Sequence, residues 1–217
     1  MIKAIIFDMD GVLIDSEPYY QSELIKCFQH FNIKVTFADL IPLAGGSTNH
    51  YDQVVNPLLE KGHVPRDAFD NYCNLNYERN PVPYPKLLFP NVREVLDWIT
   101  NHNYPIALAS SSKEYEIRNV LKACDIESYF EFIISGENFK ESKPNPEIYL
   151  ACVKKLGLSP QECMAIEDSE YGITAAKKAG LTCIAKEDLR FGYNQTKADF
   201  IVKDLFEIIN ILKEEAK

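Results

Sequence analysis

The sequence predicts an α/β protein in which a parallel sheet is flanked by helices and interrupted by an inserted all-helical segment. Three observations support this fold class. An apolar run near the N-terminus is typical of a buried strand, helical and strand patterns alternate after about residue 90, and only helical patterns occur between about residues 16 and 82. The 217 residues, 46% of them hydrophobic, suffice for one domain with a large insertion or for two small domains.

The first strand is expected over residues 2–7, and it is followed at once by two acids. Because side chains alternate along a strand, Asp8 and Asp10 should leave the sheet on one side while Met9 turns to the other. Like charges at close range raise each other's pKa, so this pair needs a cation, a shared proton or open solvent. Gly11 permits a sharp turn after the acids. Taken alone, the pair also fits a solvated turn.

The second half of the chain alternates between strands and helices. Further strands are expected over residues 105–109, 132–135 and 163–166, with edge strands near residues 182–185 and 199–202. Helices are expected over residues 92–102, 114–124, 145–156, 169–179 and from about 204 onward. Asn145 and Pro146 fit a helix start, Gly157 and Gly180 fit helix ends, and Asp204 fits a cap.

The inserted segment contains helical patterns over residues 23–31, 51–61 and 67–77. The chain enters it at Ser16-Glu17-Pro18 and leaves through a proline-rich stretch over residues 80–85, which suits a stiff connection with hinges near Ser16 and Pro83. An ordinary connection of this length is unusual in a compact domain. We therefore expect a discontinuous core domain of residues 1–15 and 83–217 and a helical cap domain of residues 16–82.

Composition narrows the class of partner and the compartment. The formal charge is -9, from 23 basic and 32 acidic residues, which argues against nucleic acid and is compatible with a small phosphate ester that meets local cations. The six cysteines are widely spaced and suit reduced core residues. No apolar run approaches membrane-spanning length, and no signal peptide precedes the first strand. We expect a cytoplasmic protein without membrane partners, and a monomer.

Polar residues follow the predicted strands at their carboxyl ends, where ligands bind in an open parallel sheet. Ser110 ends the second strand ahead of a helix whose backbone N–H groups can hold a phosphate. Lys143 stands before Pro144, which keeps it extended. Glu167 and Asp168 follow an apolar strand, where an uncompensated acid pair would be costly. Hard Mg²⁺ prefers such oxygen ligands, so Asp8 and Asp168 suit it.

The motifs Asp8-x-Asp10-Gly11-Val12, Ser110, Lys143-Pro144 and Glu167-Asp168, in this order, resemble the haloacid dehalogenase superfamily. The resemblance extends over essentially the whole chain, including the helical insertion, and the chain resembles the branch of β-phosphoglucomutases and small sugar-phosphate phosphatases. It implies a Rossmann-like core, dependence on Mg²⁺ and phosphoryl transfer through an aspartyl phosphate. It also implies that the backbone carbonyl of Asp10 is a further metal ligand.

The residues fit defined roles in such a reaction. Asp8 would be the nucleophile, and Asp10 would protonate the leaving alkoxide and then deprotonate the attacking water or hydroxyl. Ser110, Ser111 and Lys143 would bind the transferring phosphoryl group. The metal ligands would be Asp8, Asp10, Glu167 and Asp168.

The substrate is less closely defined by the sequence. Residues 15–20 resemble sugar-phosphate phosphatases of the 2-deoxyglucose-6-phosphatase type, and residues 43–48 resemble the specificity loop of the cap, with Gly45, Gly46, Ser47 and Thr48 as candidate substrate contacts. Thr48 stands where the mutase pattern carries an arginine for a second phosphate. Residues 16–82 carry five basic and eight acidic side chains, which is unfavourable for gripping a bisphosphate.

These observations favour a phosphatase acting on a small phosphate monoester, such as a sugar phosphate. The alternatives are a β-phosphoglucomutase that interconverts β-glucose 1-phosphate and glucose 6-phosphate, and a phospho-aspartate signalling domain without turnover. The helical insertion and Asp10, which would shorten the life of an acyl phosphate, argue against the signalling domain.

Overall fold

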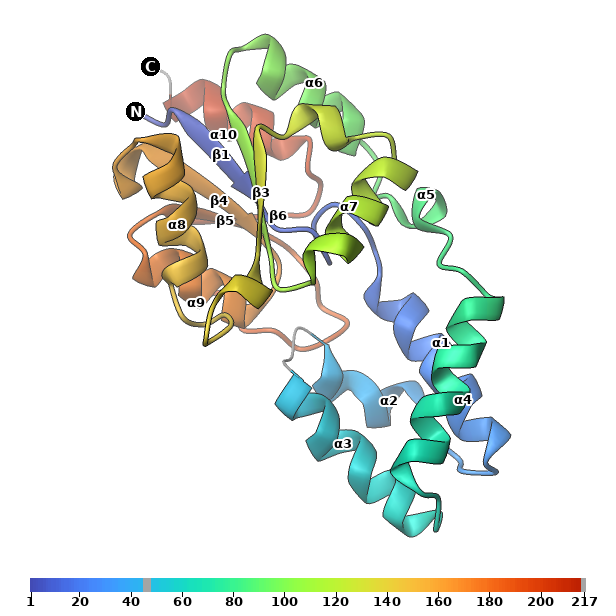
Figure 1. The fold of residues 1–217 in the computed structure, drawn as a ribbon. Helices are drawn as coiled ribbons and strands as arrows, with labels where there is room; N and C mark the ends of the chain where they lie inside the picture. Colours follow the sequence, from blue (N-terminus) through green and yellow to red (C-terminus); the bar gives the residue numbers. More distant parts are fainter. Residues whose placement is uncertain (45–47, 216–217) are drawn as a thin grey trace. The chain divides into compact units, whose positions relative to one another are not determined.

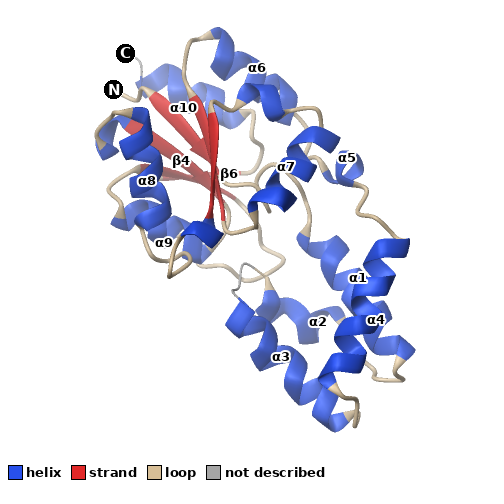
Figure 2. Cartoon of the chain, in the orientation of Figure 1, coloured by secondary structure: helices blue, strands red, loops and turns tan. Residues whose placement is uncertain are grey.

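The computed structural model describes residues 1–44 and 48–215 of the chain, with side chains from residue 51 onward in the third helix. The chain divides into two compact units, one formed by Met1–Asp15 with Tyr84–Lys217 and the other by Ser16–Pro83. We call them the sheet unit and the helical unit. Figure 2 shows that the strands lie in the former and that the latter is helical.

The sheet unit contains a six-stranded parallel sheet with the order β3-β2-β1-β4-β5-β6. The strands are β1 Ala4–Phe7, β2 Ile106–Ser110, β3 Phe132–Ser135, β4 Cys163–Glu167, β5 Thr182–Lys186 and β6 Phe200–Val202. This is the strand order of a Rossmann-like fold, so the predicted fold class is confirmed. Sites in such folds lie beyond the carboxyl ends of the central strands.

One detail of the strand prediction is wrong. We expected an edge strand near residues 182–185, but β5 pairs with β4 on one side and with β6 on the other. Cys183, Ile184 and Ala185 are fully buried. Edge position depends on which strands pair, and the short apolar run did not reveal that β6 would cover β5.

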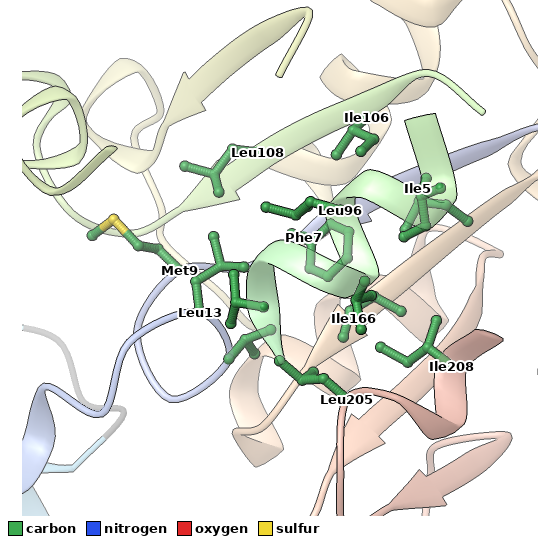
Figure 3. Packing of buried hydrophobic residues seen from close by; sticks show 14 of the residues in the cluster. Ile5, Phe7, Met9, Leu13, Leu96, Ile106, Leu108, Ile166, Leu205 and Ile208 are labelled. Atoms are coloured by element: carbon green, nitrogen blue, oxygen red, sulfur yellow. The ribbon is translucent and has the colours of Figure 1, made fainter. Parts of the chain in front are cut away.

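The two faces of the sheet bury different kinds of side chain. Ile5 and Phe7 of β1 belong to a cluster of large apolar residues with helices α6 (Val92–Asn101), α7 (Glu114–Ala123) and α10 (Glu207–Glu215), which Figure 3 shows in part. Ala4 and Ile6 point to the other face, where α8 (Glu147–Leu156) and α9 (Glu170–Lys178) pack on small residues. Figure 1 shows these helices on the two sides of the sheet. The period-two alternation of β1 therefore covers both faces.

The helices of the sheet unit are α5 Tyr84–Leu87, α6 Val92–Asn101, α7 Glu114–Ala123, α8 Glu147–Leu156, α9 Glu170–Lys178 and α10 Glu207–Glu215. Helices α6 to α10 begin and end close to their predicted limits, whereas α5 was not predicted, because it begins within the proline-rich stretch of residues 80–85 that was expected to be a stiff connection. Gly157 ends α8 in the left-handed region at φ 69°, and Ser169 caps α9 by accepting from the Gly172 N–H. Four short 3₁₀ turns complete the described elements, at Ile41–Leu43, Glu127–Tyr129, Gly136–Asn138 and Pro160–Glu162.

The helical unit packs around its own apolar core. Its helices are α1 Glu17–His30, α2 Phe37–Leu40, α3 Thr48–Lys61 and α4 Arg66–Arg79. The rings of Phe28 and Phe69 lie 4.6 Å apart between α1 and α4. Helix α1 begins earlier than the expected residue 23 because Pro18 lies in its first turn, where proline needs no hydrogen-bond partner.

The two chain segments that join the units are paired inside the sheet unit. Asp15 donates its N–H to the Leu87 carbonyl at 2.7 Å, and Phe89 donates to the Leu13 carbonyl at 2.9 Å. The Arg190 guanidinium holds both carboxylate oxygens of Asp15, at 2.8 and 2.9 Å.

All six cysteines are buried free thiols, as predicted. No helix in the described part of the chain is long and apolar enough to cross a membrane.

Candidate active site

The carboxyl ends of β1, β2 and β4 lie side by side and supply the predicted site residues. Because β1 pairs with β2 and with β4, Asp8 lies between Ser110 at the end of β2 and Glu167 with Asp168 at the end of β4. The ammonium of Lys143 is 2.6 Å from Asp8 Oδ1 and 2.6 Å from Glu167 Oε1. The structure therefore brings Asp8, Lys143, Glu167 and Asp168 together from distant parts of the sequence.

The turn after β1 directs Met9 to a different side from the acids Asp8 and Asp10. Met9 is buried in the core near Leu13 (Figure 3), whereas Asp10 is half-buried. Gly11 adopts φ +75°, and a Cβ built on it would lie 2.0 Å from Asp168 Oδ2. The glycine therefore permits both the left-handed turn and the close approach of the Asp168 carboxylate.

Asp10 has a partner that the sequence interpretation did not assign. The Ser112 hydroxyl donates to Asp10 Oδ2 at 2.9 Å, and Ser135 Oγ in turn donates to the Ser112 carbonyl at 2.7 Å. Ser112 is the third residue of a serine run, and the sequence interpretation assigned a phosphate-binding role only to the first two, Ser110 and Ser111. The run itself was the available signal, but it did not show which serine would reach the acid.

Lys143 is a buried cation held by acceptors at the carboxyl ends of β1, β2 and β4. Besides the two carboxylates, its ammonium donates to the Ala109 carbonyl at 3.0 Å, and its side chain is 7% exposed. Burial by itself lowers the pKa of Lys143, but Asp8 and Glu167 outweigh this effect and raise the pKa above its ordinary value. Lys143 therefore stays charged at neutral pH. The Lys143–Pro144 peptide bond is cis, which was not predicted.

Glu167 lies completely inside the protein and is held from three directions. Lys143 and the Tyr149 hydroxyl both donate to Oε1, and the Asp168 N–H donates to Oε2 at 3.3 Å. Gly172 makes room for this carboxylate, because a Cβ there would lie 2.0 Å from Glu167 Oε2. Sequence reasoning missed Tyr149 and Gly172. Tyr149 lies in the apolar stripe of α8, so only its hydroxyl distinguishes it from a core residue.

The acids form a set that could hold a metal ion. Asp8, Glu167 and Asp168 each offer a carboxylate oxygen, and these atoms lie within 4.8 Å of one another. All of them are hard oxygen ligands, the type that Mg²⁺ prefers over nitrogen or sulfur. The side chain of Asp10 is not part of this set.

The charge balance of the site also favours a cation. Burial raises the pKa of the Asp8 carboxyl from 3.8 to about 8, Lys143 opposes this increase, and the nearby Glu167 and Asp10 add to it. One ammonium thus faces several carboxylates in a poorly hydrated place. A divalent cation would favour the ionised form of Asp8 and relieve the repulsion among the acids.

The predicted phosphate-binding serines are placed less favourably than expected. Ser110 is buried, and its Oγ accepts the Ser112 N–H at 3.1 Å, whereas Ser111 is exposed. The Lys113 and Glu114 N–H groups at the start of α7 donate to the side chains of Glu116 and Glu137. These amides are therefore occupied, contrary to the expectation of free N–H groups, because nearby side chains compete for them.

The predicted substrate loop lies at the limit of what the structure describes. Gly45, Gly46 and Ser47 fall outside the described residues, and Thr48 is described only as the first residue of α3. Their role in substrate binding stays a prediction.

Comparison with known proteins supports these observations. The family described as haloacid dehalogenase-like hydrolase matches residues 5–186. A phosphorylated carbohydrates phosphatase from Thermotoga maritima is 32% identical over 219 residues, covering 98% of this chain and 99% of the relative. Hexitol phosphatase B from Escherichia coli is 31% identical over 204 residues and covers 88% of each chain.

Solved structures show the same likeness. A β-phosphoglucomutase from Clostridium difficile matches with a TM-score of 0.77 and 28% identity, covering 100% of this chain and 99% of that one. The resemblance inferred from the four motifs is thus confirmed by sequence and by fold. The chain belongs to the haloacid dehalogenase-like hydrolases and is an enzyme of that type.

Proposed function

We propose that the protein is a Mg²⁺-dependent phosphatase that hydrolyses a small phosphate monoester, in particular a sugar phosphate, through an aspartyl phosphate on Asp8. The observation that carries the proposal is the buried cluster in which Lys143 contacts Asp8 and Glu167 while Asp168 completes an oxygen-rich metal set. A fold does not require this many charges in one buried place, whereas phosphoryl transfer does. The similarity to two sugar-related phosphatases supports the substrate class.

The proposed reaction has two steps. In the first, a carboxylate oxygen of Asp8 attacks phosphorus, the bond from phosphorus to the sugar oxygen breaks, and Asp10 gives a proton to the departing alkoxide. In the second, Asp10 takes a proton from water, and this water attacks phosphorus and releases phosphate from Asp8. Ser112, which donates to Asp10 Oδ2, would orient the acid for both proton transfers.

The other site residues would stabilise charge. Lys143 would act as a fixed positive charge near the transferring oxygens, and Ser110 and Ser111 would bind the same group. Asp8, Glu167 and Asp168, with the Asp10 carbonyl, would hold Mg²⁺. The bound ion would favour the ionised form of Asp8 and offset the negative charge of the phosphate. We further propose that residues 16–82 act as a cap domain that excludes bulk water during turnover.

A panel of sugar phosphates, assayed for phosphate release with Mg²⁺ and with chelator, tests this function. We expect Mg²⁺-dependent release, which Asp8→Asn should abolish while the folded state is retained by circular dichroism. Asp67→Asn, a change at an exposed acid of α4, is the matched control and should leave turnover intact. Retained turnover in Asp8→Asn would rule out the covalent step.

A second assay tests the mutase alternative, which the similarity to a β-phosphoglucomutase structure supports. β-Glucose 1-phosphate is supplied with a bisphosphate primer, and glucose 6-phosphate is measured together with free phosphate. We expect free phosphate to predominate. Formation of glucose 6-phosphate without phosphate release would favour the mutase, and a stable phosphorylated protein without turnover would favour a signalling domain.

A further inference from the structure

A buried amide links the loop after β5 to the metal set. Gln195, between β5 and β6, is 7% exposed. Its Nε2 donates to the Asp168 carbonyl at 2.5 Å and to the Lys186 carbonyl at 2.7 Å, and its Oε1 accepts the Asp188 N–H at 3.4 Å. Both amide hydrogens and the amide oxygen are therefore used inside the protein. Nothing in the proposed reaction requires this residue, yet its contacts lead directly to a candidate metal ligand.

The amide lies where the backbone pairing of two central strands stops. The register between β4 and β5 ends at Glu167 opposite Ala185, so Asp168 and Lys186 are the next residues of the two strands. Gln195 joins the carbonyls of these two residues. The side chain thus continues the link between the strands at the point where Asp168 must leave the sheet with a defined direction.

Two contacts constrain the position of the Asp168 carboxylate. Gln195 fixes its carbonyl, and with it the orientation of the peptide plane that sets the Cα–Cβ direction. On the other side, the carboxylate packs against Gly11, where a built Cβ would meet Asp168 Oδ2 at 2.0 Å. Metal ions tolerate only small errors in ligand position, and groups that orient the ligands commonly change metal affinity by about 10–100-fold.

We propose that Gln195 is a positioning residue that holds Asp168 in place for metal binding. It acts through the backbone of Asp168 and not by touching the metal or the substrate. This inference rests on the proposed Mg²⁺ site. It predicts that loss of the Nε2 donors weakens metal binding while the shape of the loop is retained.

The test uses the full chain and Mg²⁺ alone, with binding measured by isothermal titration calorimetry. Gln195→Met keeps the length and approximate volume of the side chain but removes both donors, and we expect the Kd for Mg²⁺ to rise about 10-fold or more. Asn194→Ala is the matched control, because it removes hydrogen bonds to Thr196 in the same loop and none to Asp168. Its Kd should equal that of the wild type.

Kinetics then separate positioning from general destabilisation. In Gln195→Met, excess Mg²⁺ should restore kcat to within a few-fold of the wild type, with the KM for the phosphate ester unchanged. An unchanged Kd for Mg²⁺ in a folded Gln195→Met variant overturns the inference. Failure of the wild type itself to bind Mg²⁺ would instead reject the proposed metal requirement.

A measurement on the wild type covers the case in which the variant does not fold. Hydrogen exchange of side-chain amides, followed by NMR, should show strong protection of the Gln195 Nε2 hydrogens relative to those of the exposed Gln161. Equal exchange rates for the two amides would show that the Gln195 bridge is absent in solution and would also overturn the inference.

Discussion

The two units of the molecule balance their charges in different ways. In the helical unit, Arg66 pairs with Asp52 and Asp70 at 2.8 Å each, and all three side chains are about two-fifths exposed. In the sheet unit, Lys143 contacts Asp8 and Glu167 at 2.6 Å each, but its side chain is 7% exposed and that of Glu167 is fully buried. Exposed pairs contribute little to stability, whereas buried pairs carry a large desolvation cost.

This difference distinguishes charged residues whose presence the fold alone explains from charged residues whose burial requires a functional explanation. The Arg66 network joins α3 to α4 at the surface and needs no further explanation. The Lys143 cluster places several acids around one base inside a sheet that could have been closed by apolar residues. The following predictions test this contrast, from the largest expected effect to the smallest.

Removal of one cation from each unit should have consequences of very different size. Lys143→Met leaves Asp8 and Glu167 buried without their ammonium, so we expect kcat/KM to fall by about 10²–10³-fold and the free energy of unfolding to fall by about 3–5 kcal/mol. Arg66→Met should cost at most about 1 kcal/mol because its pairs are exposed, and turnover should persist. Steady-state kinetics and urea unfolding measure both. Equal losses of activity in the two variants would contradict the distinction between the exposed Arg66 pairs and the buried Lys143 cluster.

Gly172→Ala tests how tightly the buried cluster is packed. Alanine is favoured over glycine inside a helix by about 1 kcal/mol, but its Cβ would lie 2.0 Å from Glu167 Oε2. We expect the displaced carboxylate to lower kcat by about 10–10²-fold.

The control for this change is Gly157→Ala. Gly157 has a φ of +69° and no atom within 4 Å of a built Cβ, so the variant should lose about 1–2 kcal/mol of stability from backbone strain. Its kcat should be unchanged. If Gly172→Ala kept full activity, Glu167 would not need its observed position.

The metal-free protein should become less stable as pH rises from about 5 to 8. Burial raises the folded-state pKa of Asp8 to about 8, whereas in the unfolded chain this pKa is near 3.9, so in this window the folded state retains a proton that the unfolded state has released. The stability that the protonated Asp8 carboxyl contributes is present at low pH and is lost as pH approaches the folded-state pKa. In chelator, the Tm of the wild type should fall by a few degrees more than the Tm of Asp8→Asn between pH 5 and pH 8, as measured by thermal unfolding.

Added Mg²⁺ should remove this pH dependence, because the ion favours the ionised carboxyl. A pH profile that is the same for the wild type and Asp8→Asn would show that Asp8 does not titrate in this range. The excess negative charge around Lys143 would then be balanced without protonation of Asp8.

Tyr149→Phe should have the smallest effect. It removes the hydroxyl donor to Glu167 while Lys143 still holds the same oxygen, so we expect a loss of about 1 kcal/mol in unfolding free energy and a few-fold decrease in kcat/KM. The control is Tyr129→Phe, which removes an exposed hydrogen bond to Asp97. An effect of Tyr129→Phe as large as that of Tyr149→Phe would contradict the distinction between buried and exposed partners.

The sequence was sufficient to predict what depends on short segments. Strand and helix periodicity located the elements of the sheet unit except α5, and turn chemistry at Gly157 and Gly180 located helix ends. Acids at strand ends indicated the site, because parallel strands present their carboxyl ends at one edge of the sheet.

Features that depend on packing in three dimensions were not predictable. Tyr149 and Gly172 look like ordinary helix residues until the fold brings Glu167 against them. Gln195 lies in a stretch without periodicity, so nothing local indicated that its amide would reach Asp168. The inner position of β5 likewise required knowledge of the strand order.

The pairing of the two segments that leave the sheet unit has an evolutionary consequence. Ile14 and Leu88 form an antiparallel bridge, so the chain departs and returns at neighbouring points, as at the open end of a hairpin. A turn of a few residues could close this gap in place of Ser16–Pro83, and the six-stranded sheet would keep all its strands. Such a junction would allow the inserted segment to be exchanged, shortened or enlarged while the sheet and the residues at its carboxyl edge stay in place.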